Sequence, residues 1–280
     1  MLATTAEPKL RGGFHDADRS MVGVPVRALS PQVRIDNGLC TSTARALKDA
    51  LEGYPHAMVI RWGARPNSQN LTLTLLQALY RLAMPEWNMA APLRIDRSRI
   101  AVDEDLSRKR DGVTRLSRSN LAMSLHTDST YQARPFEVVA MHMARPSPTG
   151  GHLTLAPLAP VVDALPGGVV TTLQEPVFPF GRGHFPILAA TGYGDWFARY
   201  YRQQIDSAVE AGQALDCKSG DALQQLDDCL DGFASRLQMP LQAGDAIFLK
   251  NHRVLHGRTG FPATSGRILF RYRMHCPALR

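Results

Sequence analysis

SLHTDSTY, at residues 124–131, is the stretch on which an interpretation of this chain can be built. It places an imidazole and a carboxylate two residues apart in a segment whose composition suits a β-strand. Side chains at positions i and i+2 of a strand point to the same side, so His126 and Asp128 can bind one cation together. Two protein ligands are too few for a catalytic metal, so a third ligand is expected from elsewhere in the chain.

The best candidate for the third ligand is His256, within NHRVLHGR at residues 251–258. Two histidines and one carboxylate on one face of a metal, with the other positions open, are typical of non-haem Fe(II) oxygenases. Arg267 and Arg271 follow this histidine on a segment with period-two alternation. Their guanidinium groups can hold the far carboxylate of a diacid co-substrate through paired, charge-assisted hydrogen bonds.

Each of these patterns also has a structural interpretation. His126 could be a hydrogen-bonded core histidine, and Asp128 could begin a turn. His142 and His152 have no carboxylate at ligand spacing, so we expect both to be structural. A strand at 267–274 could place its arginines in water, but a metal site close before it favours an inward orientation.

Composition and charge exclude several classes of protein. Hydrophobic residues make up 44% of the chain and charged residues 20%, which is ordinary for a soluble globular protein. The net charge of +7 allows an acidic partner, yet the basic residues are scattered, so we expect no nucleic-acid partner. No signal peptide or membrane span is expected, and the four cysteines lack zinc-ligand spacing. We therefore predict a cytoplasmic protein with free thiols and no membrane partner.

Local patterns predict the elements of the first half of the chain. Residues 1–22 are expected to be a flexible leader. A helix is predicted at 44–51, capped by the hydroxyl side chains of 41–43, and a strand at 57–62. Leucines at three- and four-residue spacing then predict a helix at 71–82 that packs on a sheet.

The second half of the chain is predicted to be richer in strands. The charged segment 92–120 is a candidate cover for the active site. It is followed by predicted strands, by a helical insertion at 195–238, and by a strand that delivers His256. The strands are expected at 136–143, 152–155, 169–173, 246–249 and 267–274.

Taken in order, these motifs resemble the Fe(II)/2-oxoglutarate-dependent dioxygenases, in the branch of taurine dioxygenase and clavaminate synthase. The resemblance runs from Ala57 to Met274 and includes GGHLT at residues 150–154 and Gly244-Asp245. It implies a mainly β fold with helices (α+β), built on a double-stranded β-helix. This jelly roll, or cupin-like core, would carry flanking helices and form a single catalytic domain over residues 1–280.

The resemblance also implies the roles of individual residues. By position, His126, Asp128 and His256 match the iron ligands. Arg267 matches the arginine that binds the distal carboxylate of 2-oxoglutarate, and Thr154 matches the threonine that assists it.

Two positions depart from a simple correspondence with the family. Leu153 stands where the family often has threonine, which leaves Thr154 one place late. Arg271 matches the residue that grips the anionic group of the substrate in taurine dioxygenase. In members like clavaminate synthase the co-substrate arginine lies nearer to this position, so the two arginines could exchange roles. Asn120 and Ser129 flank the first ligands and are expected substrate contacts.

The implied chemistry needs Fe(II), 2-oxoglutarate and O₂. It releases succinate and CO₂ and hydroxylates an unactivated C–H bond, here expected in a small polar or anionic, amino-acid-like metabolite. One alternative keeps these cofactors but gives desaturation, cyclisation or epimerisation in natural-product biosynthesis. Another is a metal-binding jelly-roll protein without catalysis. The sequence leaves the substrate's identity and a homo-oligomeric state open.

Overall fold

The computed structural model describes residues 27–29, 37–64, 67–84, 93–103, 116–191, 195–236 and 238–279. The predicted leader at 1–22 lies outside these residues, as does part of the predicted cover segment, at 104–115. Among the described helices, none combines the length and the apolar composition needed to cross a bilayer.

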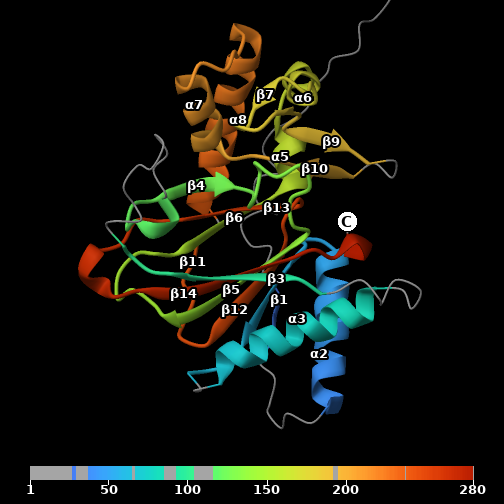
Figure 1. The fold of residues 1–280 in the computed structure, drawn as a ribbon, viewed down its shortest axis with the longest axis vertical. Coiled ribbons are helices and arrows are strands. Elements are labelled where there is room, and N and C mark those ends of the chain that lie inside the picture. Colours follow the sequence, from blue (N-terminus) through green and yellow to red (C-terminus); the bar gives the residue numbers. More distant parts are fainter. Residues whose placement is uncertain are drawn as a thin grey trace, which may run out of the picture.

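The fold is mixed α and β, with two mostly antiparallel sheets at its centre (Figure 1). The six-stranded sheet has the order β1-β2-β12-β5-β14-β3, and its β1–β2 pair is parallel. The four-stranded sheet has the order β11-β6-β13-β4. The strands of the larger sheet are β1 (Arg27–Leu29), β2 (Ala57–Arg61), β3 (Ile95–Ile100), β5 (Val138–Arg145), β12 (Asp245–Lys250) and β14 (Ile268–Met274); those of the smaller are β4 (Met123–His126), β6 (Leu153–Pro157), β11 (Gln238–Met239) and β13 (Val254–Arg258).

The two sheets face each other across a shared apolar core. Val139 and Leu269 of the larger sheet are buried in one cluster with Leu155 and Val254 of the smaller. Side chains of a strand alternate between its two faces, so the opposite faces of both sheets need separate covers. Helices supply both covers (Figure 1).

Helices α2 (Asn37–Glu52) and α3 (Ser68–Ala83) cover the outer face of the six-stranded sheet. The predicted leucine stripe is confirmed, since Leu75, Leu76 and Leu79 are buried against this sheet. The predicted cap at 41–43 is wrong, because α2 already begins at Asn37.

A second helical layer covers the four-stranded sheet and lies at the top of Figure 1. The strand predicted at 169–173 is wrong, because these residues belong to helix α6. The β-branched run suggested a strand, but Val169, Thr172 and Leu173 recur at helical spacing and are buried. Pro166 directly precedes the helix, where its fixed φ is tolerated. The helices of this layer are α5 (Leu158–Ala164), α6 (Gly167–Leu173), α7 (Arg202–Glu210) and α8 (Cys217–Arg236).

The segment predicted as a helical insertion, 195–238, begins with a strand. Trp196 and Phe197 were expected on a helical face, but β10 (Trp196–Ala198) pairs antiparallel with β9 (Leu188–Ala190). The helices α7 and α8 follow. Short elements complete the described fold: β7 (Phe178–Pro179), β8 (His184–Phe185), η2 (Leu116–Arg118), η3 (Ala263–Ser265) and η4 (Pro277–Leu279).

Candidate metal centre

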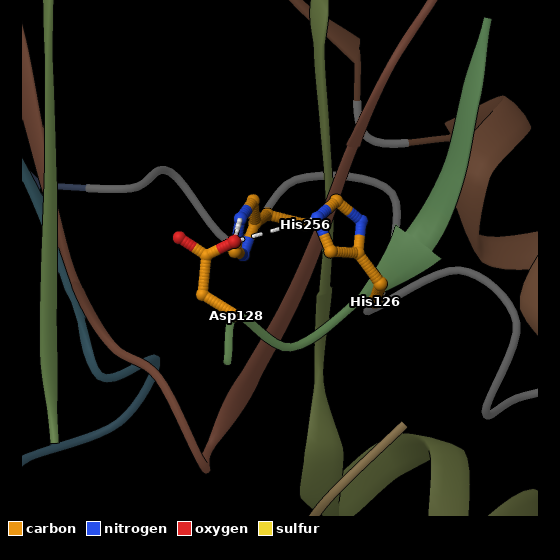
Figure 2. Close-up of side chains that lie close together, drawn as sticks. All are labelled: His126, Asp128 and His256. Carbon is orange, nitrogen blue, oxygen red and sulfur yellow. Dashed lines mark ion pairs between the residues drawn. The ribbon is translucent and has the colours of Figure 1, made fainter. Parts of the chain in front are cut away.

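The side chains of His126, Asp128 and His256 lie close together (Figure 2). One potential ligand atom from each residue lies within 4.8 Å of the other two, and all three residues are buried. The Nε2 atoms of His126 and His256 lie 3.7 and 4.0 Å from Asp128 Oδ1. The donor set and its spacing fit a divalent transition metal bound on one face.

Strand register brings the two histidines together. His256 on β13 is the direct cross-strand partner of His126 on β4, and their ring centroids are 4.6 Å apart. Gly257 allows this close pairing, because a Cβ at that position would lie 2.6 Å from the carbonyl oxygen of Met123. Residues directly opposite in an antiparallel pair present their side chains on the same face.

Asp128 reaches the site from a turn rather than from the strand that the sequence suggested. Strand β4 ends at His126, and Asp128 begins the turn that follows. The Asn251 side chain fixes this turn: its Oδ1 accepts from the Asp128 N–H at 2.8 Å. Its Nδ2 donates to the carbonyl oxygens of Asp128 and Phe136, at 3.1 and 2.9 Å. Asn251 is fully buried, so this clamp is shielded from water.

The surroundings of His126 select its metal-binding nitrogen. Its Nδ1 lies 2.9 Å from the carbonyl oxygen of Ser124, so Nδ1–H donates and Nε2 keeps its lone pair for the metal. Tyr201 packs on the imidazole with ring centroids 4.9 Å apart. The backbone carbonyl oxygen of the preceding residue, Tyr200, accepts a 2.7 Å hydrogen bond from the Thr127 N–H. The second helical layer therefore braces the ligand strand.

Charges around the triad favour the protonation states that metal binding needs. Burial alone would raise the pKa of Asp128, but Arg271 and the two histidines hold that pKa well below its usual range. Arg271 Nη1 donates to Asp128 Oδ1 at 2.9 Å. Burial lowers the pKa of His256 to about 3, so its imidazole is neutral at physiological pH. Asp128 Oδ2 is buried with no hydrogen-bond partner among the described residues, which suits a metal ligand.

A narrow space of about 50 Å³ beside the triad, here called the arginine cavity, is lined by three arginine residues. Arg267, which directly precedes β14, lines it together with Leu269 and Arg271 of that strand, so these three side chains point inward as predicted. The other face, with Tyr272 and Met274, packs on α2 and α3. The lining residues are Ile100, Ser117, Met123, His126, Met141, Leu153, Leu241, His256, Gly257, Arg258, Arg267, Leu269 and Arg271.

The arginines of this cavity are held firmly. Arg267 and Arg258 are 6% and 7% exposed, and both stack on the ring of Phe261. Burial lowers the pKa of each to about 10, so both stay charged at neutral pH. Gly151 packs against Arg267: a Cβ there would lie 3.1 Å from the Arg267 Nε, and its φ of +68° favours glycine.

A wider space of about 240 Å³, here called the polar cavity, also reaches His126 and Asp128. Many of the residues that line it carry a hydroxyl, phenol or amide group, and Arg271 and Arg273 line it as well. The lining residues are Leu116, Ser117, Met123, His126, Thr127, Asp128, Ser129, Thr130, Tyr131, Tyr201, Gln203, Gln204, Arg271 and Arg273.

Two of the expected contacts do not reach either cavity directly. Leu153 lines the arginine cavity, and because side chains alternate along β6, Thr154 points to the opposite face. The expected role of Thr154 beside Arg267 is therefore corrected. The Asn120 side chain donates to the Phe261 carbonyl at 3.1 Å, so it holds the ring under the arginines. Ser129 does line the polar cavity.

The sequence interpretation gave no role to Asn251, Arg258 or Tyr201. Asn251 and Arg258 lie inside the quoted NHRVLHGR motif, but their contacts join residues far apart in the chain, so no local pattern predicted their roles. Arg258 donates to the carbonyl oxygens of Ser119 and Leu121, at 2.9 and 2.6 Å, which only the fold reveals. His142 is structural, as expected: it is buried and bonded to side chains of α3.

Comparisons with known proteins agree with this geometry. Residues 198–273 match the sequence model of the family described as taurine catabolism dioxygenase TauD, TfdA family. This part of the chain is therefore similar to that family. Dioxygenase str8 from Strobilurus tenacellus is 27% identical over 162 residues, which cover 53% of this chain. The match spans 37% of that relative, little more than a third of its length.

Solved structures of similar fold cover most of the chain. An asparagine oxygenase in complex with Fe(II), 2S,3S-3-hydroxyasparagine and succinate has a TM-score of 0.62 at 19% identity. That alignment covers 84% of this chain and 79% of the other. The non-haem iron oxygenase OrfP, in complex with Fe and alpha-ketoglutaric acid, has a TM-score of 0.56 at 16% identity, covering 85% and 82%. At these identities the likeness establishes the fold.

Proposed function

We propose that this TauD-like chain is a non-haem Fe(II)/2-oxoglutarate-dependent oxygenase. The observation that carries the proposal is the convergence of His126, Asp128 and His256 beside a cavity lined by Arg267 and Arg271. In this proposal the two sheets form a double-stranded β-helix, and the chain acts as a single catalytic domain. The reaction hydroxylates an unactivated C–H bond of a small polar or anionic, amino-acid-like molecule.

The proposed iron site uses the two Nε2 atoms and the Asp128 carboxylate. When bound, Fe(II) with 2-oxoglutarate and O₂ would supply the oxidising chemistry, with succinate and CO₂ as co-products. The protein's own contribution is placement. Asn251 fixes the Asp128 turn, the Ser124 carbonyl orients His126, and Gly257 lets His256 approach.

Arg267 is the better of the two arginines for the distal carboxylate of 2-oxoglutarate. Its guanidinium is buried, lines the arginine cavity and pairs with no carboxylate among the described residues. Arg271, in contrast, already donates to Asp128 Oδ1. We therefore assign Arg267 to the co-substrate and give Arg271 the task of holding the metal ligand. A guanidinium matches a carboxylate through two parallel hydrogen bonds.

Anaerobic addition of Fe(II) and 2-oxoglutarate tests the proposal directly. The expected result is a weak visible charge-transfer band, followed under air by slow release of succinate without substrate. A metal-binding protein without catalysis would release no succinate. Absence of the band at saturating Fe(II) and 2-oxoglutarate would overturn the assignment.

A further inference from the structure

Arg273 provides a second guanidinium that the proposed co-substrate site does not use. It follows Arg271 by two residues on β14, so both side chains lie on the same face of the strand. Both line the polar cavity beside His126 and Asp128. Arg271 is engaged with Asp128, whereas Arg273 Nη1 lies 3.3 Å from the hydroxyl oxygen of Ser129.

The charge of Arg273 is only partly compensated. Its other Nη atom pairs with Asp96, a side chain that is 42% exposed, so water screens that ion pair. The Arg273 side chain itself is 14% exposed and lies over the ring of Phe136. Its Nε is buried with no hydrogen-bond partner among the described residues. A largely buried cation with a weak partner attracts an anion from the cavity it lines.

Ser129 supplies a second donor next to this guanidinium. The residue has a φ of +63°, a left-handed conformation that is uncommon for a residue other than glycine. Such conformations cluster at ligand sites, where the surrounding structure holds them in place. The hydroxyl accepts from Arg273 and keeps its own proton for another acceptor. Ser129 also adjoins Asp128 in sequence, so an anion held here lies close to the metal ligands.

We propose that Ser129 and Arg273 bind a carboxylate of the substrate, which makes the substrate a small carboxylic acid. This inference rests on the proposed function and moves the anion contact from Arg271 to Arg273. A cavity of about 240 Å³ suits a small metabolite rather than a polymer. A molecule anchored at Arg273 presents its carbon skeleton to His126, which lines the same cavity.

The test measures binding to anaerobic protein that carries Fe(II) and 2-oxoglutarate. Isothermal titration uses a matched panel: small aliphatic and N-acetylamino carboxylates, their primary amides, and the corresponding amines. Carboxylates are expected to bind about 10- to 100-fold more tightly than their amides, as one hydrogen-bonded ion pair allows. Equal binding by amides or amines overturns the proposal, and so does a panel in which no carboxylate binds at millimolar concentration.

Variants then assign the preference to this site. Arg273→Gln is expected to remove the preference for carboxylates, and Arg273→Lys to restore part of it. Ser129→Gly, which keeps the left-handed backbone, should weaken carboxylate binding a few-fold. Arg97→Gln is the matched control, because Arg97 is exposed and lies over Phe270 and Tyr272, on the opposite face of the sheet. A preference that survives Arg273→Gln overturns the proposal.

The two proposals fail in distinguishable ways. If the protein forms no charge-transfer band with Fe(II) and 2-oxoglutarate, the oxygenase assignment fails. If the band forms but the panel shows no preference for carboxylates, only the role of Ser129 and Arg273 fails.

Discussion

The arginine cavity and the polar cavity meet at the same metal triad but hold their cations differently. Arg258 and Arg267 are buried, stacked on Phe261 and fixed by backbone carbonyls or glycine contacts. Arg273 instead pairs with an exposed carboxylate and a hydroxyl. The first arrangement holds the two guanidinium groups in one geometry, which suits the proposed co-substrate 2-oxoglutarate. The second is wider and more adaptable, which suits the substrate.

The largest expected effect comes from His126, which lines both cavities and is one of the three proposed metal ligands. His126→Ala removes one of three proposed ligands and should weaken Fe(II) binding by more than about 100-fold, since loss of a supporting partner alone costs about 10- to 100-fold. Equilibrium dialysis against Fe(II) under anaerobic conditions measures the change. His152→Ala is the control, because His152 lies outside the triad. Equal affinity in both variants would contradict the metal assignment.

The next effect separates the two cavities. Arg267→Gln should raise the Kd for 2-oxoglutarate by about 10- to 100-fold, because a charge-assisted, bidentate contact is lost. Arg273→Gln should change this Kd by less than about threefold, because its side chain lines only the polar cavity. Anaerobic titration of the charge-transfer band measures both values. If the two variants shifted the Kd equally, the two cavities would not be functionally distinct.

His142 lines neither cavity, so its effect on stability can be measured separately from binding at the site. Burial lowers the pKa of His142 to about 4. As the pH falls below about 6.5, the unfolded chain binds a proton that the folded chain refuses, so the free energy of unfolding decreases until the pH reaches about 4. His142→Gln should reduce this pH dependence by at most about 1.4 kcal/mol per pH unit. Urea unfolding from pH 7 to pH 4 tests it, and identical slopes would refute it.

The smallest effect concerns the wall of the arginine cavity. Gly151 and Gly181 both have positive φ, at +68° and +81°, but only Gly151 faces Arg267. Replacement by alanine should cost about 1–2 kcal/mol of stability at either position. Only Gly151→Ala should also raise the Kd for 2-oxoglutarate, by a few-fold, because the new methyl group displaces the Arg267 side chain. A similar Kd change in Gly181→Ala would show that strain alone is responsible.

Much of the site could be predicted because its signals are local. Alternation along residues 267–274 placed Arg267 and Arg271 on one face, and the two-residue spacing paired His126 with Asp128. In the structure the two residues do not share a strand, because Asp128 lies in a turn that Asn251 holds in place. A contact between residues so far apart in the chain leaves no local pattern to detect.

The errors have the opposite origin. Residues 169–173 form a helix although their β-branched side chains favour a strand, because packing against the second helical layer overrides local preference. Thr154 was placed by position in a motif, and one residue of offset on a strand reverses the direction of a side chain. The stacking of Phe261 under Arg258 and Arg267 depends on tertiary structure alone.

The cross-strand pairing of His126 with His256 also links chemistry to assembly. A slip of β13 by a single position would turn the His256 imidazole toward the helices. Asp128 would then face only one histidine, His126. Iron affinity therefore reports on the register of β13 against β4. A refolded sample with native helicity but misaligned strands would be recognised because it fails to retain the ion.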